Sequence, residues 1–217
     1  MKQGIFVVLL IAVSTAFASL WNESAFFLAQ GEMAKKKKEQ AFSRSVGSCH
    51  GGGVVFYVNT NQDAPSGQHG LIVALADATT GCASPTGTCE WDTNGYTPKI
   101  IAPHTDYFTG AKNTKEILKA LGSSRAQAAY AASQYRGGGY ADWYLPAQKE
   151  LMMLYTQLSS KGDSFWTRCG GSAPAAGSYW SSTQVGTSVA WGIAFVNGNV
   201  PYGVTTSTLG VRAVRAF

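Results

Sequence analysis

Four cysteines are the residues of this 217-residue chain best suited to covalent chemistry: Cys49, Cys82, Cys89 and Cys169. In an oxidising compartment four thiols can form two disulfides, with three connectivities open. We favour Cys82 with Cys89, which closes the short loop CASPTGTC, and Cys49 with Cys169, which ties the start of the domain to a late loop. Zinc binding is the competing use of these thiols. The sequence has no Cys-x-x-Cys pair and its three histidines are scattered, so we expect no metal.

The common motifs of hydrolysis and phosphate chemistry are missing from the sequence. It contains no Gly-x-Ser-x-Gly, no phosphate-binding loop and no His-Glu-x-x-His. A nucleophilic Cys169 served by a distant histidine is the competing enzymatic interpretation. His69 in GQHGL and His104 in APHTD are interpreted as turn residues. We therefore predict a protein that is not an enzyme and uses no cofactor.

Several aromatic and cationic side chains are suited to direct carbohydrate binding. Aromatic rings can stack on sugar faces, and lysine or arginine can bind sulfate groups through charge-assisted hydrogen bonds. The Glu-Pro-Asn, Gln-Pro-Asp and Trp-Asn-Asp sequences of calcium-dependent lectins are absent, so capture through calcium is not expected. Each aromatic ring could instead belong to the core. The candidates for ligand contact are Trp180, Trp191, Tyr202, Lys112, Lys115, Lys161 and Arg168.

The chain begins with the order of a secretory signal peptide, predicted over residues 1–18. One lysine precedes an apolar run from Ile5 to Val13, and the small-residue sequence AFA ends at Ala18, where cleavage is expected. An uncleaved membrane anchor extending through Trp21 and a pilin-type leader are the alternatives. All three place the body outside the cytoplasm, either secreted, in the periplasm or on the outer surface. A membrane is a partner only if this helix remains uncleaved.

Residues 19–45 are predicted to form a linker or short helix that carries the run KKKK at Lys35 to Lys38. Most of the formal net charge of +5 lies in the N-terminal segment, since residues 1–45 hold six basic and three acidic side chains. Eleven basic and nine acidic residues follow from Val46 onward. A lysine run is typical of a solvated face, with contact to an anionic surface as the alternative. No nucleic-acid partner is expected.

The remaining residues, 46–217, are predicted to be one α+β domain with about three helices in the middle and a β-rich C-terminal part. Apolar runs in GGGVVFYVNT and GLIVALA predict strands, as do SYWSST, VAWGIAFV, VPYGVTT and GVRAVRAF near the end. Helices are predicted to begin at Asn113 and Ser124 as capping residues and after Pro146, with stops at Gly122 and Gly137. The first and last strands are expected to be neighbours.

The stretch YRGGGYADWYLPAQKEL combines three glycines, an extended segment and the start of the third helix. We interpret it as a structural brace, because each residue has a turn or packing task and none forms a catalytic pair. Trp143 and Leu145 are expected to cover the apolar face of that helix. A buried pairing of an acid from this stretch with a C-terminal arginine is predicted. The structural candidates are Asp142, Trp143, Glu150, Arg212 and Arg215.

An ordered series of segments resembles a known bacterial family. GGGVVFYV, HGLIVA, YRGGGYADWYLP, KEL, YWSST and the terminal VRAVRAF are similar, in that order, to the C-terminal domain of the Legionella collagen-like adhesin and its relatives. The resemblance covers about residues 46–217. It implies a C-type-lectin-like fold, distantly shared with the formylglycine-generating enzymes, and it implies trimeric assembly and binding of sulfated glycosaminoglycans. This chain departs from the family in lacking the collagen repeat and in carrying Ala147 where relatives often have a capping serine.

These observations lead to one function and one alternative. We expect an extracytoplasmic, adhesin-type domain that recognises glycans, with sulfated polysaccharides or similar polyanions as partners, in attachment or biofilm formation. The alternative is a protein-recognition or structural surface module, such as a pilus- or envelope-associated display domain, with no glycan ligand.

Overall fold

The computed structural model describes residues 25–33, 35, 45–59, 68–84 and 86–217. The chain divides into two compact units, Met1–Ser43 and Arg44–Phe217. In the first unit, residues 25–33 are helical and expose Phe26, Phe27 and Leu28. The predicted signal peptide and Lys36 to Lys38 lie outside the described residues. Among the residues that are described, none of the helices is long and apolar enough to span a bilayer.

The second unit contains helices and antiparallel sheets. Its helices are α2 (Gly110–Leu121), α3 (Gln127–Gln134), the 3-10 turn η1 (Gly137–Gly139), α4 (Gln148–Leu158) and α5 (Asp163–Thr167). Its strands are β1 (Cys49–His50), β2 (Gly53–Val58), β3 (Gly70–Ala74), β4 (Cys89–Glu90), β5 (Ser178–Gly186), β6 (Val189–Ala194), β7 (Tyr202–Val204), β8 (Thr208–Leu209) and β9 (Val214–Ala216). The α+β prediction is therefore confirmed.

The sheet β1-β2-β3-β9 joins the start and the end of this unit. Strand β9 pairs antiparallel with β3, so the first and last strands share one sheet, as expected, with β2 and β3 between them. The uninterrupted apolar runs of β2 and β3 follow from burial of both sheet faces. Alternate residues enter two separate clusters: Ile72 packs on one side, and Leu71 and Val73 pack on the other.

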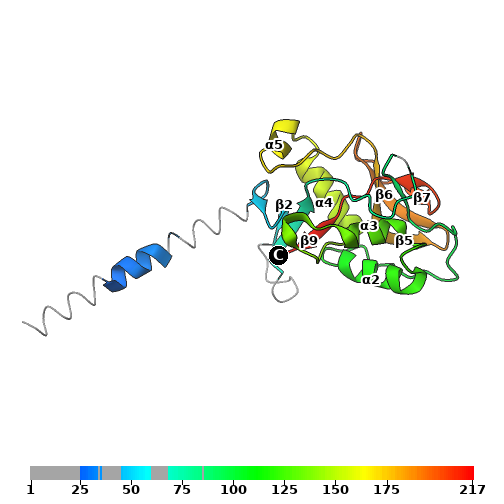
Figure 1. Ribbon diagram of the computed structural model, residues 1–217, viewed down its shortest axis with the longest axis horizontal. Coiled ribbons are helices and arrows are strands. Elements are labelled where there is room, and N and C mark those ends of the chain that lie inside the picture. The colour runs from blue at the N-terminus through cyan, green and yellow to red at the C-terminus, as the bar shows by residue number, and fades with distance from the viewer. Residues whose placement is uncertain (1–24, 34, 36–44, 60–67, 85) are drawn as a thin grey trace, which may run out of the picture. The chain divides into compact units, whose positions relative to one another are not determined.

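The helices divide between the two clusters. Ile117 of α2 and the alanines of α3 pack in the first, and Leu151, Leu154 and Leu158 of α4 pack in the second. In Figure 1, α2 lies along the lower edge of the folded unit and α5 at its upper edge, while the C-terminus lies beside β9. The other sheets are β5-β6-β7 and the pair β4-β8.

The segment before α4 corrects one packing expectation. Trp143 and Leu145 belong to the first cluster with α2 and α3, whereas Tyr144 between them joins α4 in the second. Successive side chains of an extended segment point to opposite sides, so only the middle residue can reach α4. The α4 face is otherwise covered by residues of β2 and β6, including Phe56 and Ile193.

Both disulfides connect the predicted partners. Cys49 in β1 is bonded to Cys169 after α5, and Cys82 is bonded to Cys89 in β4. The first bond spans 120 positions of sequence and ties the N-terminal edge of the unit to the region after α5. Helix α5 itself was not predicted, since five residues are too few to show a helical period.

Two helix starts differ from the sequence prediction. Helix α2 begins at Gly110, three residues before Asn113, and Ala126 rather than Ser124 precedes α3. Asn113 is buried, and its amide donates to the His104 carbonyl oxygen at 2.7 Å and to Ser182 Oγ at 3.2 Å. It therefore holds the 103–105 loop against α2 and β5. The predicted stop at Gly122 is confirmed, with φ of 74°.

Candidate functional site

Trp180 is a core residue and not a ligand contact. Its side chain is fully buried, and its indole N–H donates to the Cys89 carbonyl oxygen at 2.8 Å. The backbone at this point is equally enclosed, because Trp180 pairs with Gly192 across β5 and β6. A ring in this position has no free face for a sugar, so the sequence-based assignment of Trp180 is wrong.

Trp191 and Tyr202 form an aromatic pair on the other side of the same sheet. They are opposite each other on β6 and β7, and their ring centroids are 5.9 Å apart in an edge-to-face arrangement. Tyr202 is 64% exposed, whereas Trp191 is half-buried. Val204, 53% exposed, follows on the same face of β7. The pair is accessible, and Val204, its exposed neighbour on β7, is apolar.

Lys161 and Arg168 lie on either side of α5 and both contact Phe165. The Lys161 ammonium is 5.9 Å and the Arg168 guanidinium 4.5 Å from the centroid of that ring. Arg168 also donates to the backbone oxygen of Gly47. Arg168 therefore helps to attach α5 to the N-terminal edge of the unit, and it is less available to a ligand than Lys161.

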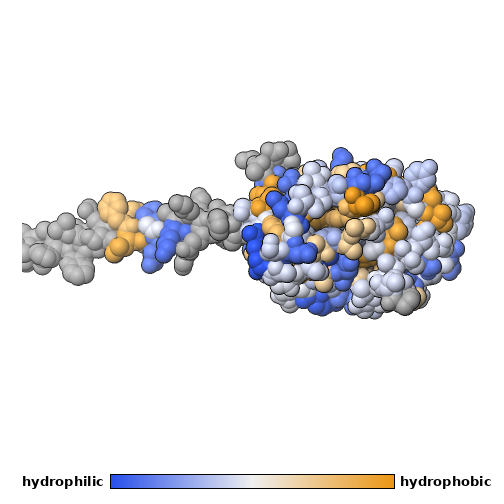
Figure 2. All heavy atoms as spheres, turned by 90° about the horizontal axis from the view of Figure 1, so that it is seen from above, coloured by the Kyte–Doolittle hydropathy of each residue, from blue (hydrophilic) through white to orange (hydrophobic). Residues whose placement is uncertain are grey.

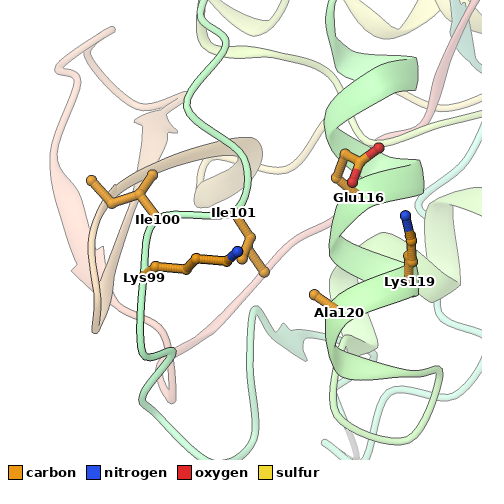
Figure 3. Close-up of a pocket in the computed structure, with 6 residues that line it drawn as sticks. All are labelled: Lys99, Ile100, Ile101, Glu116, Lys119 and Ala120. Carbon is orange, nitrogen blue, oxygen red and sulfur yellow. The ribbon is translucent and has the colours of Figure 1, made fainter.

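Lys112 and Lys115 lie on α2, beside a pocket that the sequence analysis did not identify. The pocket has a volume of about 370 Å³ and lies between the loop residues Lys99, Ile100 and Ile101 and the helix residues Glu116, Lys119 and Ala120. Figure 3 shows the Lys99 and Ile101 side chains extending from the loop toward α2, whereas Ile100 points away from the helix. We call the pocket and the adjoining helix face the lysine groove, comprising Lys99, Ile100, Ile101, Lys112, Lys115, Glu116, Lys119 and Ala120.

The positions of the lysines follow from helix geometry. Lys112, Lys115 and Lys119 are three and four residues apart, which places them along one face of α2. The buried residues of α2, including Thr114 and Ile117, turn the opposite side toward the core. All four lysines of the groove are exposed. Lys99 could not be found from helical spacing, because it comes from a loop separated from α2 in sequence.

The loop that carries Lys99 is held in place by a buried glutamine of β5. The Gln184 side-chain oxygen accepts the Ile101 N–H at 2.7 Å, and the Gln184 backbone N–H donates to the Ala102 carbonyl oxygen at 2.8 Å. The Gln184 amide also donates to Thr97 Oγ1 at 2.6 Å. Both ends of the loop are therefore fixed to the sheet, and the pocket wall is attached to a rigid element.

The ionic interactions of the folded unit separate its cations into two groups. Four of its eleven basic side chains after Val46 are in ion pairs: Arg125 with Asp92, Lys149 with Asp106, Arg212 with Asp77 and Arg215 with Asp142. None of the four lysines of the groove forms an ion pair with another residue that the structure describes. Glu116 is the acidic residue closest in sequence to the lysines of α2. It lines the groove and is half-buried. A nearly neutral domain therefore carries a local cationic face.

Glu150 positions the helix that carries these lysines. Its buried carboxylate accepts the backbone N–H of Ala147 at 2.7 Å, and also those of Gly110 and Phe108 at the start of α2. One side chain thus accepts donors from the starts of both α4 and α2, while the serine cap missing at position 147 is replaced by Thr183 Oγ1 and the Thr105 carbonyl oxygen, which accept the N–H groups of Gln148 and Lys149. A side chain at Gly110 would collide with this carboxylate. Burial raises the pKa of Glu150 to about 7, although the three backbone N–H groups act to lower it.

Arg212 and Arg215 form ion pairs with different aspartates. Arg215 makes two hydrogen bonds to Asp142, at 2.8 and 2.9 Å, and stacks 3.8 Å from the Tyr140 ring centroid. These hydrogen bonds hold the pKa of Asp142 below its usual value. Arg212 is buried and pairs with Asp77 at 2.8 Å, rather than with either predicted acid. The brace therefore consists of two separate arginine clamps on either side of β9.

The other side chains that could support catalysis or metal binding do not come together in the described part of the chain. Within the described part of the chain, no group of three or more His, Cys, Asp or Glu side chains could hold a metal ion. His104 lies in a loop, where its backbone N–H and carbonyl oxygen both bond to Asn113. Cys169 is in a disulfide, so it is not a thiol nucleophile in this state.

Comparisons with known proteins support a family assignment. Residues 76–215 match the Lcl C-terminal domain family. No curated protein matches the chain. Among solved structures, the chain is similar to a fimbrial protein from Bacteroides ovatus ATCC 8483, with 18% identity and a TM-score of 0.45. That similarity covers 76% of this chain and 44% of the fimbrial protein, so the chain spans less than half of its length. On the match over residues 76–215, this chain belongs to the Lcl C-terminal domain family.

Proposed function

We propose that this chain is an extracytoplasmic, non-enzymatic attachment domain that binds sulfated polysaccharides through the lysine groove. Family membership supports the broader class, an extracellular adhesin or surface-display domain. The disulfides Cys49–Cys169 and Cys82–Cys89 fit an oxidising location. The observation that carries the ligand assignment is the cluster of four exposed lysines without ion-pair partners among the described residues.

The groove favours a polymer with several acidic groups over a single small anion. Lys112 and Lys119 are seven residue steps apart on the helix, or about 10 Å along the axis. A ligand must therefore extend along α2 to contact all three helix lysines, while Lys99 approaches it from the loop. Ile101 and Ala120 offer apolar contact to the less polar face of a sugar ring. Because the ammonium groups are exposed, added salt should weaken binding strongly.

The test is a glycan array probed with the exported chain and two multiple variants. Replacing Lys99, Lys115 and Lys119 with Gln should remove binding to sulfated glycans. Replacing Lys35 to Lys38 with Gln provides the matched control, since it removes four lysines outside the groove and should leave most of that binding. Loss of binding only in the control would show that the N-terminal lysine run, and not the groove, attracts the polymer.

The alternative function, protein recognition, has one specific observation in its favour. Tyr202, Val204 and Val196 are 64%, 53% and 67% exposed around β6 and β7. Figure 2 shows apolar groups on the visible face as separate patches among hydrophilic ones. If the array shows no glycan binding while Tyr202→Ala abolishes capture of a surface protein, protein recognition is the better assignment.

A further inference from the structure

We propose that Glu116 sets the ligand specificity of the lysine groove, by binding free sugar hydroxyl groups at the centre of the groove and rejecting a sulfate there. This selection rests on the proposed function, since it requires that the groove binds a sulfated polysaccharide. It adds the class of polymer. The groove should favour a chain in which sulfated positions alternate with neutral positions over a chain that is sulfated throughout.

Glu116 lies between two lysines along the groove. It comes four positions after Lys112 and three positions before Lys119, so the three side chains share one face of α2, separated by about 6 Å and about 4.5 Å along the axis. Glu116 and Lys119 both line the pocket, and Lys99 extends toward them from the loop (Figure 3). A polymer that follows the helix from Lys112 to Lys119 therefore passes the Glu116 carboxylate.

The Glu116 carboxylate is not used to hold the fold together. It forms no ion pair with any residue that the structure describes. By contrast, Asp77, Asp92 and Asp142 each pair with an arginine. Glu116 is half-buried at the pocket wall, where its two oxygens can accept hydrogen bonds from a ligand without first breaking a contact of the fold.

The carboxylate distinguishes a hydroxyl group from a sulfate by hydrogen bonding and by charge. An ionised carboxylate only accepts hydrogen bonds, so it binds sugar O–H groups through charge-assisted bonds. A sulfate has no donor to offer and is repelled by the negative charge. Because Glu116 is half-buried, this repulsion is screened less than it would be on an open surface. Sulfates are therefore favoured at the lysines on either side of Glu116 and disfavoured at Glu116 itself.

The test compares two heparin-derived oligosaccharides of equal length, one fully sulfated and one from which the 2-O-sulfates have been removed. Binding to the purified chain is measured by titration calorimetry. Glu116→Gln keeps the size and an acceptor oxygen but removes the charge. It should raise the affinity for the fully sulfated oligosaccharide about threefold, as expected for a partly exposed charge contact, and change the affinity for the desulfated one less than about 1.5-fold.

The matched control is Asp163→Asn, which removes the same charge from the first turn of α5. Helix α5 lies at the opposite edge of the folded unit from α2 (Figure 1), so this variant should leave both affinities unchanged. An equal gain in Asp163→Asn would show an effect of net charge alone and would overturn the role of Glu116. So would a Glu116→Gln variant whose gain is absent or is no larger for the fully sulfated oligosaccharide.

A lysine variant separates failure of this selection from failure of the proposed function. If Lys99→Gln combined with Lys119→Gln weakens binding of both oligosaccharides, the groove binds the polymer, and the Glu116→Gln result alone decides the selection. If the lysine variant binds both oligosaccharides as the wild type does, the groove is not the binding site, and the proposed function and the selection by Glu116 are both wrong.

Discussion

The buried carboxylate of Glu150 predicts that the domain loses stability as the pH rises through neutrality. Glu150 has no exposed surface and accepts backbone N–H groups from the starts of both α2 and α4. Burial raises its pKa from 4.5 to about 7, and this effect exceeds the opposing effect of those N–H groups. The folded state therefore binds the Glu150 proton more tightly than the unfolded state does.

The sign and size of the effect follow from this pKa difference. The stabilising contribution is complete below the unfolded pKa of about 4.5 and is lost as the pH rises through about 7. A difference of about 2.5 pKa units corresponds to about 3 kcal/mol of unfolding free energy. For a unit of this size, each kcal/mol changes the melting temperature by about 2 to 4 °C, so Tm should fall by about 6 to 12 °C between pH 4.5 and pH 8.

The assay is thermal and urea unfolding of the wild type and of Glu150→Gln, followed by circular dichroism from pH 4.5 to 8.5. The variant cannot ionise at this position, so the pH-dependent difference between the two proteins isolates Glu150. Asp142 does not interfere, because its lowered pKa places its titration below this range. A wild-type stability that stays level or rises from pH 5 to 8, relative to the variant, would refute the reasoning.

Three further perturbations test the brace. Arg212→Met leaves Asp77 and the Ala74 carbonyl oxygen without their donor and should lower the free energy of unfolding by about 3 kcal/mol, measured in urea. An unchanged urea midpoint would show that Arg212 does not stabilise the fold. Gly52→Ala should lower Tm by an amount equivalent to at least about 2 kcal/mol, because φ is 80° and the added methyl would overlap the backbone of Gly137; a Tm equal to that of the wild type would contradict this packing. Cys49→Ser opens the bond to Cys169, whose loop of 120 positions predicts a loss of about 4 to 5 kcal/mol; a variant that unfolds at the wild-type urea concentration would show that the bond constrains little.

The sequence predicted the strands and the Cys82–Cys89 bond well because these depend on local composition, and Cys49 and Cys169 are the two cysteines that this bond leaves. Continuous apolar runs such as those of β2 and β3 have few alternatives to a doubly buried strand. The short loop between Cys82 and Cys89 likewise favours closure on itself. These features are determined mainly by residues close together in the chain.

The site was harder to predict because burial depends on partners that are distant in sequence. Asn113 has the composition of a helix cap, yet His104 and Ser182 hold it inside the fold. From the sequence alone, Trp180 is a candidate for stacking on a sugar. Its hydrogen bond to the Cys89 carbonyl oxygen shows that it lies in the core. Lys99 comes next to α2 only because Gln184 fixes its loop. Pattern analysis identifies Lys112 and Lys115 but cannot supply the opposite wall of the groove.

The most direct test of the lysine groove is the affinity of the purified chain for heparin, measured at several salt concentrations. The wild type should bind heparin, and its affinity should fall steeply as salt increases. Lys99→Gln combined with Lys119→Gln should weaken binding at least about tenfold at low salt and flatten the salt dependence, whereas replacing Lys35 to Lys38 with Gln should change it little. Heparin binding that is unaffected by the double variant, at every salt concentration, would contradict a polyanion site in the groove.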